Sequence, residues 1–416
     1  MIAAMTDRGK SVSVIGGGPA GLMAAERLSA DGFAVTVYER KPSPARKFLM
    51  AGRGGLNITH SENLEDFLRR YSGPASPAVR DSVRAFKPED LRAWCEGLGQ
   101  ETFVGSSGRV FPKSLKASPL LRAWIARLTA QGVRFKMQYT WTGWADENFL
   151  RFTTGNGAEE TARADAVILA LGGASWPSLG SDGSWMPLLS ARGVGFTPFM
   201  PTNCGFHVAW SEIFRERFSG SPLKGIALES GGWRVAGEAM IDRKGIEGGA
   251  IYALSSVIRD AAAREGSASL HIDLRPNMTV RDIADRLSRT ARGRKSFSTY
   301  LQKALSFNPL STGLLREADR GAADKGADEL AALIKAVPLT VSGAFDIGRA
   351  ISSAGGVAAS EIDGAFMLKK IPGTFCAGEM MDWEAPTGGY LLQACFATGV
   401  SAAEGAAAWL RRQTTA

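Results

Sequence analysis

A glycine cluster near the start of the chain constrains its fold more than any other feature. Gly16–Gly21 follows a short apolar stretch, Val12–Ile15, and precedes a helix-like run. Gly16, Gly18 and Gly21 fit the G-x-G-x-x-G pattern of a dinucleotide-binding turn. In this pattern the first glycine permits the tight turn, the second lets the backbone approach a pyrophosphate, and the third lets helix and strand pack closely. The N–H groups at the helix start would then face the pyrophosphate.

A second apolar strand ends in an acid at the distance that such a turn requires. Ala34–Tyr38 is predicted as the strand, and Glu39 follows it, about 20 residues past the fingerprint. A carboxylate in this place accepts hydrogen bonds from ribose hydroxyls, each worth roughly 1.5–3 kcal/mol when the acceptor is charged. Because glycine makes up 49 of the 416 residues, the glycine pattern alone is weak evidence. The order of strand, turn, helix, strand and acid favours a nucleotide site over a plain glycine turn.

The segment that follows, Arg40–Asn57, is basic and rich in glycine. Its glycines, Gly52 and Gly54 among them, indicate backbone N–H groups exposed to a ligand. Lys47 lies in the same segment and adds a positive charge that suits phosphates. A flexible loop with solvated cations is the alternative, and this segment alone does not separate the two.

Two later strands also end in residues typical of a ligand site. Ala166–Ala170 is a continuous apolar run of the kind found in buried parallel strands, and Gly172 and Gly173 follow it. Ligands of open α/β sheets bind at this end of such strands. Near the C-terminus a short strand closes on Gly378 and Glu379. A second carboxylate of this kind meets the ribityl chain or the pyrophosphate region in two-part flavin folds.

A glycine pair then opens the last helix. Gly388 and Gly389 precede Tyr390 and a helix-like run to Arg411. The N-terminus of this helix would point at the ring system of a flavin, where its N–H donors stabilise the negative charge of the reduced ring. Tyr390 is the candidate catalytic residue, as a stacking partner or a proton donor. Packing of an aromatic side chain at a helix start explains this tyrosine equally well.

Local patterns predict further elements between these segments. They are two helices within Leu64–Leu98, a hairpin over Glu101–Phe111, an amphipathic helix over Ala117–Ala130, and strands at Val133–Trp141 and Phe149–Thr153. From about Phe196 to Ser342 the composition changes, and short strands precede several helical runs without a chemical motif. Because the nucleotide-domain pattern resumes afterwards, we predict a nucleotide-binding domain in two parts, residues 1–195 and 343–416, with an inserted domain at 196–342.

The overall composition describes an ordinary soluble protein, with 45% hydrophobic and 22% charged residues. No apolar run approaches ~18 residues and no signal-peptide pattern opens the chain, so we expect no membrane span and a cytoplasmic location. Four cysteines without a C-x-x-C pair and three scattered histidines predict no metal site. The net charge of +8 suits nucleic acid or an anionic substrate, but the basic residues are spread out, with short clusters such as Arg289–Lys295. A solvated face is the favoured interpretation, and nucleic acid is not expected as a partner.

Taken together, these segments resemble a family of bacterial flavoproteins, the BaiN and YhiN-like proteins, which also includes aminoacetone-oxidase-like enzymes. The resemblance rests on Gly16–Gly21 with Glu39, Arg46–Asn57, Gly108–Lys116, Leu169–Pro177 and Gly378–Gln393. Its most specific stretches are GRVFPKSLKA, which begins at Gly108, and GE…PTGGYLLQA, which begins at Gly378. The chain departs from the family at Leu56, where the common motif is G-G-R-C-N, and at Leu391, where asparagine is common.

The resemblance implies a fold, a cofactor and its contacts. The fold is α/β: a split two-part FAD-binding Rossmann-like domain, with a parallel sheet and a β-meander, that carries an inserted β-barrel with helices. The cofactor is noncovalent FAD. The residues expected to bind it are Gly16, Gly18, Pro19, Ala20, Gly21, Glu39, Arg40, Lys47, Gly52, Gly54, Asn57, Gly172, Gly173, Gly378, Glu379, Gly388, Gly389 and Tyr390.

We therefore expect an FAD-dependent oxidoreductase in which a hydride passes through the flavin from a donor to an acceptor. The leading hypothesis is a reductase of a small organic substrate. NAD(P)H would be a transient donor, because the chain has no second G-x-G-x-x-G. One alternative is an oxidase of a small amine or hydroxy compound that passes electrons to dioxygen. Another is a non-catalytic redox sensor or a nucleic-acid-associated flavoprotein, which only the net charge supports.

Overall fold

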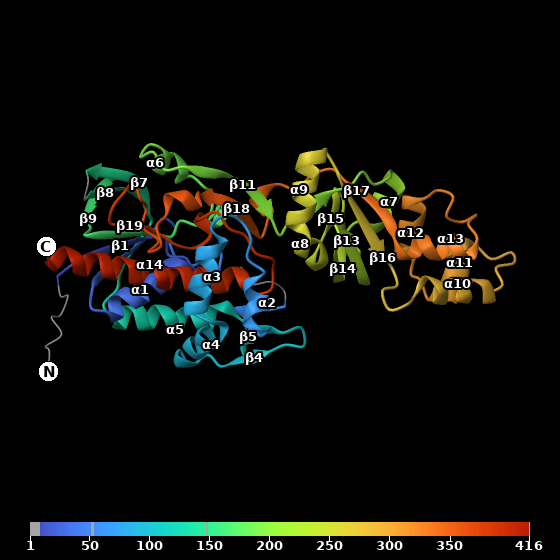
Figure 1. The fold of residues 1–416 in the computed structure, drawn as a ribbon, viewed down its shortest axis with the longest axis horizontal. Coiled ribbons are helices and arrows are strands. Elements are labelled where there is room, and N and C mark those ends of the chain that lie inside the picture. Colours follow the sequence, from blue (N-terminus) through green and yellow to red (C-terminus); the bar gives the residue numbers. More distant parts are fainter. Residues whose placement is uncertain (1–8, 51–53, 147–148, 416) are drawn as a thin grey trace. The chain divides into compact units, whose positions relative to one another are not determined.

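The computed structural model describes residues 9–50, 54–146 and 149–415 (Figure 1). The chain forms two compact units: the split unit consists of Met1–Met200 and Ser352–Ala416, and the inserted unit is Pro201–Ile351. The insert was expected at residues 196–342. The observed unit begins five residues later and ends nine residues later than this expectation. The two connections between the units contain β11 (Phe196–Thr202) and β18 (Ser352–Val357), which pair with each other in a two-stranded sheet. Most of β11 and all of β18 therefore belong to the split unit.

A five-stranded parallel sheet forms the centre of the split unit, in the order β19-β10-β1-β2-β6. Its strands are β1 (Ser11–Ile15), β2 (Ala34–Glu39), β6 (Arg134–Met137), β10 (Ala166–Leu169) and β19 (Thr374–Cys376). All four pairings are parallel, and almost all residues of β1, β10 and β19 are buried. Such burial is typical of a parallel sheet with both faces covered, so the apolar runs predicted as strands lie in the core.

The register of this sheet brings four strand ends to one edge. Ile15 of β1 pairs with Tyr38 of β2 and with Leu169 of β10. Leu169 in turn pairs with Cys376 of β19. Because parallel strands in register end level with one another, the residues that follow these four strands must meet at the same carboxyl edge.

Two helices from opposite ends of the chain pack together in the split unit (Figure 1). They are α1 (Pro19–Ala30) and α14 (Tyr390–Thr415).

Glu26 of α1 is a buried carboxylate that accepts hydrogen bonds from the indole Nε1 of Trp94 at 3.0 Å and of Trp124 at 2.6 Å. The guanidinium of Arg127 donates a third, at 2.9 Å. Trp94 belongs to α4 (Pro88–Gly97), and Trp124 and Arg127 belong to α5 (Ala117–Ala130). Since a buried charge requires such partners, they join α4 and α5 to α1.

The remaining elements of the split unit are short. A three-stranded antiparallel sheet, in the order β3-β5-β4, contains β3 (Thr59–His60), β4 (Thr102–Val104) and β5 (Arg109–Pro112). A meander contains β7 (Tyr139–Asp146), β8 (Phe149–Thr154) and β9 (Glu159–Arg163). The short helices are α2 (Leu64–Leu68), α3 (Ser76–Ala85) and α6 (Met186–Ser190), with 3₁₀ turns η1 (Pro177–Leu179), η3 (Ala359–Glu361) and η4 (Gly378–Met380).

Two local predictions can be compared with these elements. The hairpin predicted over Glu101–Phe111 is confirmed as β4 and β5, which pair antiparallel. The segment Leu64–Leu98 holds three helices where two were predicted. The third begins because Pro88 leaves Lys87 extended, at ψ 167°, and a proline starts a helix more readily than it continues one.

The inserted unit is built on a six-stranded antiparallel sheet in the order β12-β15-β14-β13-β16-β17. Its strands are β12 (Phe206–His207), β13 (Pro222–Ser230), β14 (Trp233–Asp242), β15 (Gly245–Glu247), β16 (Ala268–Asp273) and β17 (Val337–Val341). The amide of His207 donates to the carbonyl of Gly343 at 2.9 Å, and the amide of Ser342 donates to the carbonyl of His207 at 3.0 Å. These bonds link β12 to the residues that directly follow β17, so the sheet curls into a half-barrel where a small barrel was expected.

Helices complete the inserted unit. They are α7 (Glu212–Phe218), α8 (Gly249–Ala253), α9 (Ser255–Glu265), α10 (Val280–Arg289), α11 (Phe297–Leu305), α12 (Pro309–Ala318) and α13 (Ala327–Lys335), with the 3₁₀ turn η2 (Ile347–Arg349). Among the helices that the structure describes, none combines the length and the apolar character needed to cross a bilayer.

Candidate cofactor site

The turn between β1 and α1 has the geometry that the glycine pattern predicts. Gly16 has φ +106°, and a Cβ atom there would lie 2.3 Å from the carbonyl oxygen of Ala170. A Cβ atom on Gly21 would lie 2.0 Å from the carbonyl oxygen of Gly16. At Gly18, by contrast, a Cβ atom would have no protein atom within 4 Å. Gly16 and Gly21 are therefore required by packing inside the protein, whereas Gly18 keeps open the space where a ligand would approach.

Glu39 holds this turn from the end of β2. Its Oε2 accepts a hydrogen bond from the amide of Gly17 at 2.9 Å, and its Oε1 accepts one from the amide of Lys41 at 2.8 Å. Gly18 caps α1 without a side-chain hydrogen bond, so the helix start presents backbone N–H groups. The turn thus combines a carboxylate with a positive helix end, as a ribose next to a pyrophosphate requires.

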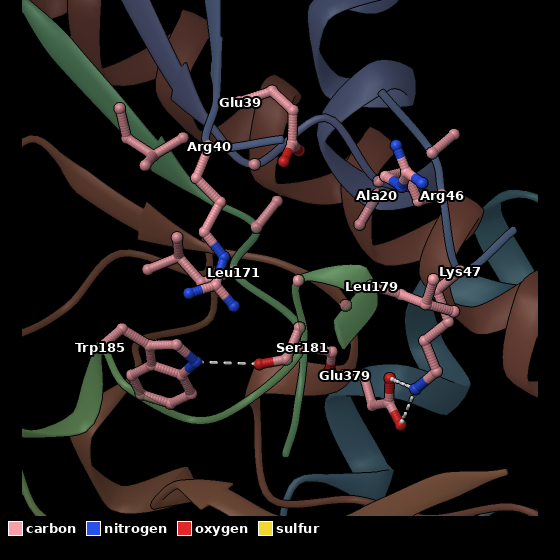
Figure 2. Close-up of a pocket in the computed structure, with 18 of the residues that line it drawn as sticks. Ala20, Glu39, Arg40, Arg46, Lys47, Leu171, Leu179, Ser181, Trp185 and Glu379 are labelled. Carbon is pink, nitrogen blue, oxygen red and sulfur yellow. Dashed lines mark hydrogen bonds and ion pairs between the residues drawn. The ribbon is translucent and has the colours of Figure 1, made fainter. Parts of the chain in front are cut away.

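An open cleft runs along the carboxyl edge of the parallel sheet, and Figure 2 shows part of its lining. The predicted cofactor residues that line it are Gly16, Gly18, Pro19, Ala20, Glu39, Arg40, Lys47, Gly172, Gly378 and Glu379. Most of these residues lie at or directly after the ends of four strands that are distant in the sequence, while Pro19 and Ala20 begin α1 and Lys47 lies in the segment after β2. The parallel register therefore assembles most of the predicted site in one place.

Other predicted residues lie behind or beside the cleft. Gly21 packs against the turn, and a Cβ atom on Gly173 would lie 1.9 Å from Oγ of Ser353. The side-chain amide of Asn57 donates through Nδ2 to the main-chain carbonyls of Thr59 and Val110. These bonds fix the loop that contains Asn57. The structure also places Gly54, Gly388, Gly389 and Tyr390 outside the lining of the cleft, and Gly52 lies outside the described residues.

Lys47 and Glu379 form an ion pair across the cleft (Figure 2). Nζ of Lys47 lies 2.8 Å from Oε2 of Glu379 and donates to Oγ of Ser175 at 2.7 Å. Oε1 of Glu379 also accepts from the amide of Ser353 at 3.0 Å. Both charges were predicted to contact the cofactor separately, and the structure shows that each is balanced by the other. A ligand phosphate would have to compete with Glu379 for Lys47.

A loop after β10 forms a wall of the cleft that the sequence did not indicate. Arg40 donates to Asp182 at 2.9 Å, which connects the end of β2 to this loop. Burial alone would raise the pKa of Asp182, but hydrogen bonds from Arg40 and Ser184 lower it overall, so the pair stays charged. Trp176 begins the turn η1 in the left-handed region, at φ +62°, which is strained for a bulky side chain.

Two buried polar atoms in the cleft have no partner among the described residues. They are Oγ of Ser181, in the same loop, and Nε1 of Trp141, on β7. The indole of Trp185, in contrast, donates to the carbonyl of Gly172 at 3.0 Å. A buried donor without a partner is costly, so Ser181 and Trp141 indicate that a ligand with acceptor atoms belongs in this cleft. No sequence motif marks these two residues, and only the fold brings both into the lining of the cleft.

Tyr390 takes part in a polar cluster next to the start of α14. Its hydroxyl donates to Oε1 of Glu62 at 2.5 Å, and its ring stacks on His60 with 5.6 Å between centroids. Burial, followed by the hydrogen bond to Glu62, raises the pKa of Tyr390, so the phenol keeps its proton. Burial alone would raise the pKa of Glu62, but its bonds from Arg70 and Tyr390 lower it. The catalytic role of Tyr390 stays a prediction.

The cleft fits FAD on four counts. Gly18 leaves room for a pyrophosphate, α1 directs its N-terminus there, Glu39 suits a ribose, and the free donors of Ser181 and Trp141 suit acceptor atoms.

Cys395 also lines the cleft, but burial and the neighbouring Glu379 raise the pKa of its thiol to about 12. It therefore stays protonated. No cluster of metal-ligating side chains occurs in the part of the chain that the structure describes.

Comparison with known proteins identifies relatives along almost the whole chain. The family model described as HI0933-like protein Rossmann domain matches residues 10–405. The 3-dehydro-bile acid delta(4,6)-reductase of Clostridium scindens is 26% identical over 95% of this chain and 98% of its own length. The ribosomal RNA dihydrouridine synthase of Haemophilus influenzae is 24% identical over 65% of each protein.

Solved structures share the fold at low sequence identity. Mycobacterium smegmatis Sdh1, solved in complex with UQ1, has a TM-score of 0.52 and 18% identity, over 97% of this chain and 69% of that one. The 3-ketosteroid delta1-dehydrogenase of Sterolibacterium denitrificans has a TM-score of 0.52 and 14% identity, over 96% of this chain and 100% of that one. At these identities the likeness shows the architecture and no more.

Proposed function

Because the chain belongs to the HI0933-like Rossmann-domain family of FAD-dependent oxidoreductases, we propose that it reduces a carbon–carbon double bond conjugated to a carbonyl group. NAD(P)H would supply the electrons as a transient donor. The observation that carries the proposal is the cleft at the carboxyl edge of the parallel sheet, where the glycine turn, Glu39 and two unpartnered donors come together.

The names of two relatives support the choice of a double bond. One is a delta(4,6)-reductase of a bile acid, and the other produces dihydrouridine, a uridine whose ring double bond is saturated. Their substrates differ in size and charge, but both reactions add two hydrogens across an activated carbon–carbon bond. A shared reaction with different substrates is what a common cofactor with different surroundings would produce.

The proposed reaction balances with the nicotinamide as reductant. NAD(P)H gives up a hydride and becomes NAD(P)⁺, while the substrate gains that hydride at the β-carbon and a proton at the α-carbon. Bound FAD supplies the two-electron transfer between the donor and the substrate. The carbonyl conjugated to the double bond takes up the developing negative charge until the proton arrives, so the site needs a proton source.

The chain's own residues would hold and orient the cofactor. Glu39 would accept hydrogen bonds from ribose hydroxyls while it holds the amide of Gly17. The ion pair of Arg40 and Asp182 would restrict access to that end of the cleft, and the donors of Ser181 and Trp141 would bind acceptor atoms. Tyr390, whose phenol stays protonated, is the proposed source of the proton.

The proposal is tested by mixing the FAD-loaded protein with NADH or NADPH in the absence of oxygen. We expect one of them to bleach the flavin absorbance, and 2-cyclohexenone or uridine to restore it under the same conditions. Tyr390→Phe should slow the restoration without slowing the bleaching. If neither nicotinamide bleaches the flavin and a small amine or hydroxy acid does so with turnover by dioxygen, the protein is an oxidase.

A further inference from the structure

A phenol, a carboxylate and a guanidinium form a continuous hydrogen-bonded series at the start of α14. The hydroxyl of Tyr390 donates to Oε1 of Glu62 at 2.5 Å. Arg70 binds the same carboxylate through two nitrogens: its Nε lies 3.2 Å from Oε1, and its Nη2 lies 2.7 Å from Oε2. Glu62 therefore contacts the phenol on one side and the guanidinium on the other.

Exposure to solvent increases along this series. Tyr390 is 5% exposed, whereas the side chains of Glu62 and Arg70 are 16% and 49% exposed. The phenol is almost completely buried, and the carboxylate that accepts its proton is in contact with water. A proton from solvent can thus reach the phenol through Glu62.

The ring of Tyr390 is held by contacts other than the bond to Glu62. The hydroxyl of the buried Tyr71 donates to the main-chain carbonyl of Tyr390 at 2.9 Å. The ring of Phe67 lies 4.8 Å from that of Tyr390, measured between centroids, and His60 stacks on it. Changing the carboxylate alone should therefore leave the ring in place.

His60 lies close to the carboxylate, but its two ring nitrogens have other partners. Nδ1 accepts a hydrogen bond from the amide of Glu62 at 3.1 Å. Nε2 lies 2.9 Å from the carbonyl oxygen of Ser107, which only accepts, so Nε2 carries the proton of the ring. Nδ1 lies 4.0 Å from Oε1 of Glu62, which exceeds hydrogen-bonding distance. The imidazole is therefore not the next group in the series.

The charge of Glu62 decides what the phenol can do. An ionised carboxylate only accepts hydrogen bonds, so it keeps the phenolic hydrogen directed at itself. Burial, and after it Glu62, raises the pKa of Tyr390, while Arg70 acts in the opposite direction. A phenolate beside the ionised carboxylate is therefore unfavourable. A proton on Glu62 removes both obstacles, because a carboxylic acid can donate to the phenol oxygen and carries no charge.

We propose that Glu62 is the positioning residue through which Tyr390 takes up, from water, the proton that it delivers to the substrate. A proton from water binds a carboxyl oxygen of Glu62, and the hydrogen bond between the two side chains reverses. The O–H bond of Tyr390 then breaks as a C–H bond forms at the α-carbon, and the proton of Glu62 passes to the phenol oxygen. Both side chains return to their initial states, and water supplies the proton that the substrate gains. The relay rests on the reaction proposed above for the destination of this proton.

The test uses the full-length, FAD-loaded protein, reduced by NAD(P)H without oxygen and then mixed with 2-cyclohexenone. Glu62→Gln keeps an acceptor oxygen for Tyr390 but carries no acidic proton, and Glu62→Ala leaves space for a small acid. Both variants should bleach at the native rate and restore the flavin absorbance at least about tenfold more slowly. Added formate should speed the restoration in Glu62→Ala but not in Glu62→Gln, which a merely structural role would not produce.

The meander offers a matched control. The hydroxyl of Tyr139 donates to Oε2 of Glu160 at 2.9 Å, and Lys136 pairs with the same carboxylate at 3.4 Å. This group has the same order of phenol, carboxylate and cation, but Glu160 is exposed. Glu160→Gln removes an equivalent charge and should bleach and restore at native rates.

A second measurement follows the phenol without any substrate. The ultraviolet absorbance of tyrosinate is recorded during an alkaline titration, and the curve of Tyr390→Phe is subtracted. Tyr390 should ionise at a lower pH in Glu62→Gln than in the native protein, because a neighbouring negative charge has been removed. Glu160→Gln should leave this ionisation unchanged.

Three outcomes would overturn the relay: native rates of restoration in Glu62→Gln, slow restoration in Glu62→Ala that formate does not speed, or an unchanged ionisation of Tyr390. If the native protein bleaches and 2-cyclohexenone restores it, any of these outcomes leaves the reductase standing and removes only the role of Glu62. If NAD(P)H does not bleach the native protein, the reductase is wrong. The titration then decides on its own whether Glu62 controls the phenol.

Discussion

The split unit and the inserted unit distribute their functional residues in different ways. In the split unit, Gly18, Glu39, Gly172 and Gly378 are far apart in the sequence and meet because four parallel strands end at one edge. In the inserted unit, seven arginines and two lysines follow one another within residues 275–316, on and between successive helices. The difference teaches that a cleft at a sheet edge is assembled from distant segments of the chain, whereas a charged surface can arise from residues that are neighbours in the sequence.

Each unit also contains a buried carboxylate that holds elements together, Glu26 in the split unit and Asp273 in the inserted unit, and their partners differ. Glu26 of the split unit has two indole donors, one of which, Trp124, is fully buried, and Arg127. Asp273 of the inserted unit is paired with two cations, Arg234 at 2.6 Å and Lys335 at 2.7 Å. Arg234 is about half exposed, at 47%, so it can be rehydrated if its partner is lost. The indole of Trp124 is fully buried, so water cannot replace Glu26 as its acceptor.

The largest expected effect tests this contrast. Glu26→Ala should lower the free energy of unfolding of the split unit by about 3–5 kcal/mol, because it leaves buried donors without an acceptor. Asp273→Ala should cost the inserted unit less, about 1–3 kcal/mol, since its cations reach water. Urea unfolding, with hydrogen exchange to assign each loss to a unit, measures both. Equal losses would show that exposure of the partners does not decide the cost.

The next effect separates packing from ligand access within one turn. Gly21→Ala places a methyl group against the carbonyl of Gly16 and should destabilise the split unit by about 1–3 kcal/mol. Gly18→Ala meets no protein atom, so the fold should keep its stability while the affinity for FAD falls. Thermal unfolding of the FAD-free protein and FAD titration distinguish them. A destabilised Gly18→Ala protein would contradict this division of roles.

The two carboxylates of the cleft should respond in different ways. Glu39→Gln removes a charged acceptor and should weaken FAD binding by about 1.5–3 kcal/mol, which is tenfold or more. Glu379→Gln is the matched control, because it removes the same charge but frees Lys47 for a phosphate, so we expect little loss of affinity. Calorimetric titration with FAD measures both. Similar losses would mean that the cleft does not bind its ligand as proposed.

The smallest expected effect is a pH dependence at the start of α14. The pKa of Glu62 lies below its ordinary value of 4.5, so its contribution to stability is complete above that value. The contribution is lost as the pH falls through the lowered pKa. Tyr390→Phe removes one of the donors that lower this pKa, so the variant should lose less stability on acidification. Melting temperatures between about pH 3 and pH 7 test this, and parallel curves for both proteins would exclude the link.

Several features could be predicted from the sequence because they depend on local rules. The helix α5 covers the predicted residues Ala117–Ala130, and the turn at Gly16 has the positive φ that its glycine allows. The hairpin of β4 and β5 follows from alternation around a glycine turn. The helix α12 was not predicted, although Asn308 caps it and Pro309 begins it. Asn308 and Pro309 are typical residues at a helix start, but the hydrophobic periodicity of the sequence did not indicate a helix after them.

The walls of the cleft could not be predicted in the same way. Ser181 and Trp141 carry no motif, and they matter only because the loop after β10 and the meander place them beside the strand ends. The pairing of Lys47 with Glu379 joins residues 332 positions apart. No local pattern encodes such a distance, since it results from the packing of the whole unit.

The sequence by itself determined the dinucleotide turn, the acid after the second strand and the excess of positive charge. These properties depend on residue types and short spacings, which sterics and charge alone constrain. Only the tertiary structure decided which residues share the cleft and which charges neutralise each other. The physical reason is that contacts between distant segments arise from the register and packing of strands and helices, and these are settled only when the core forms.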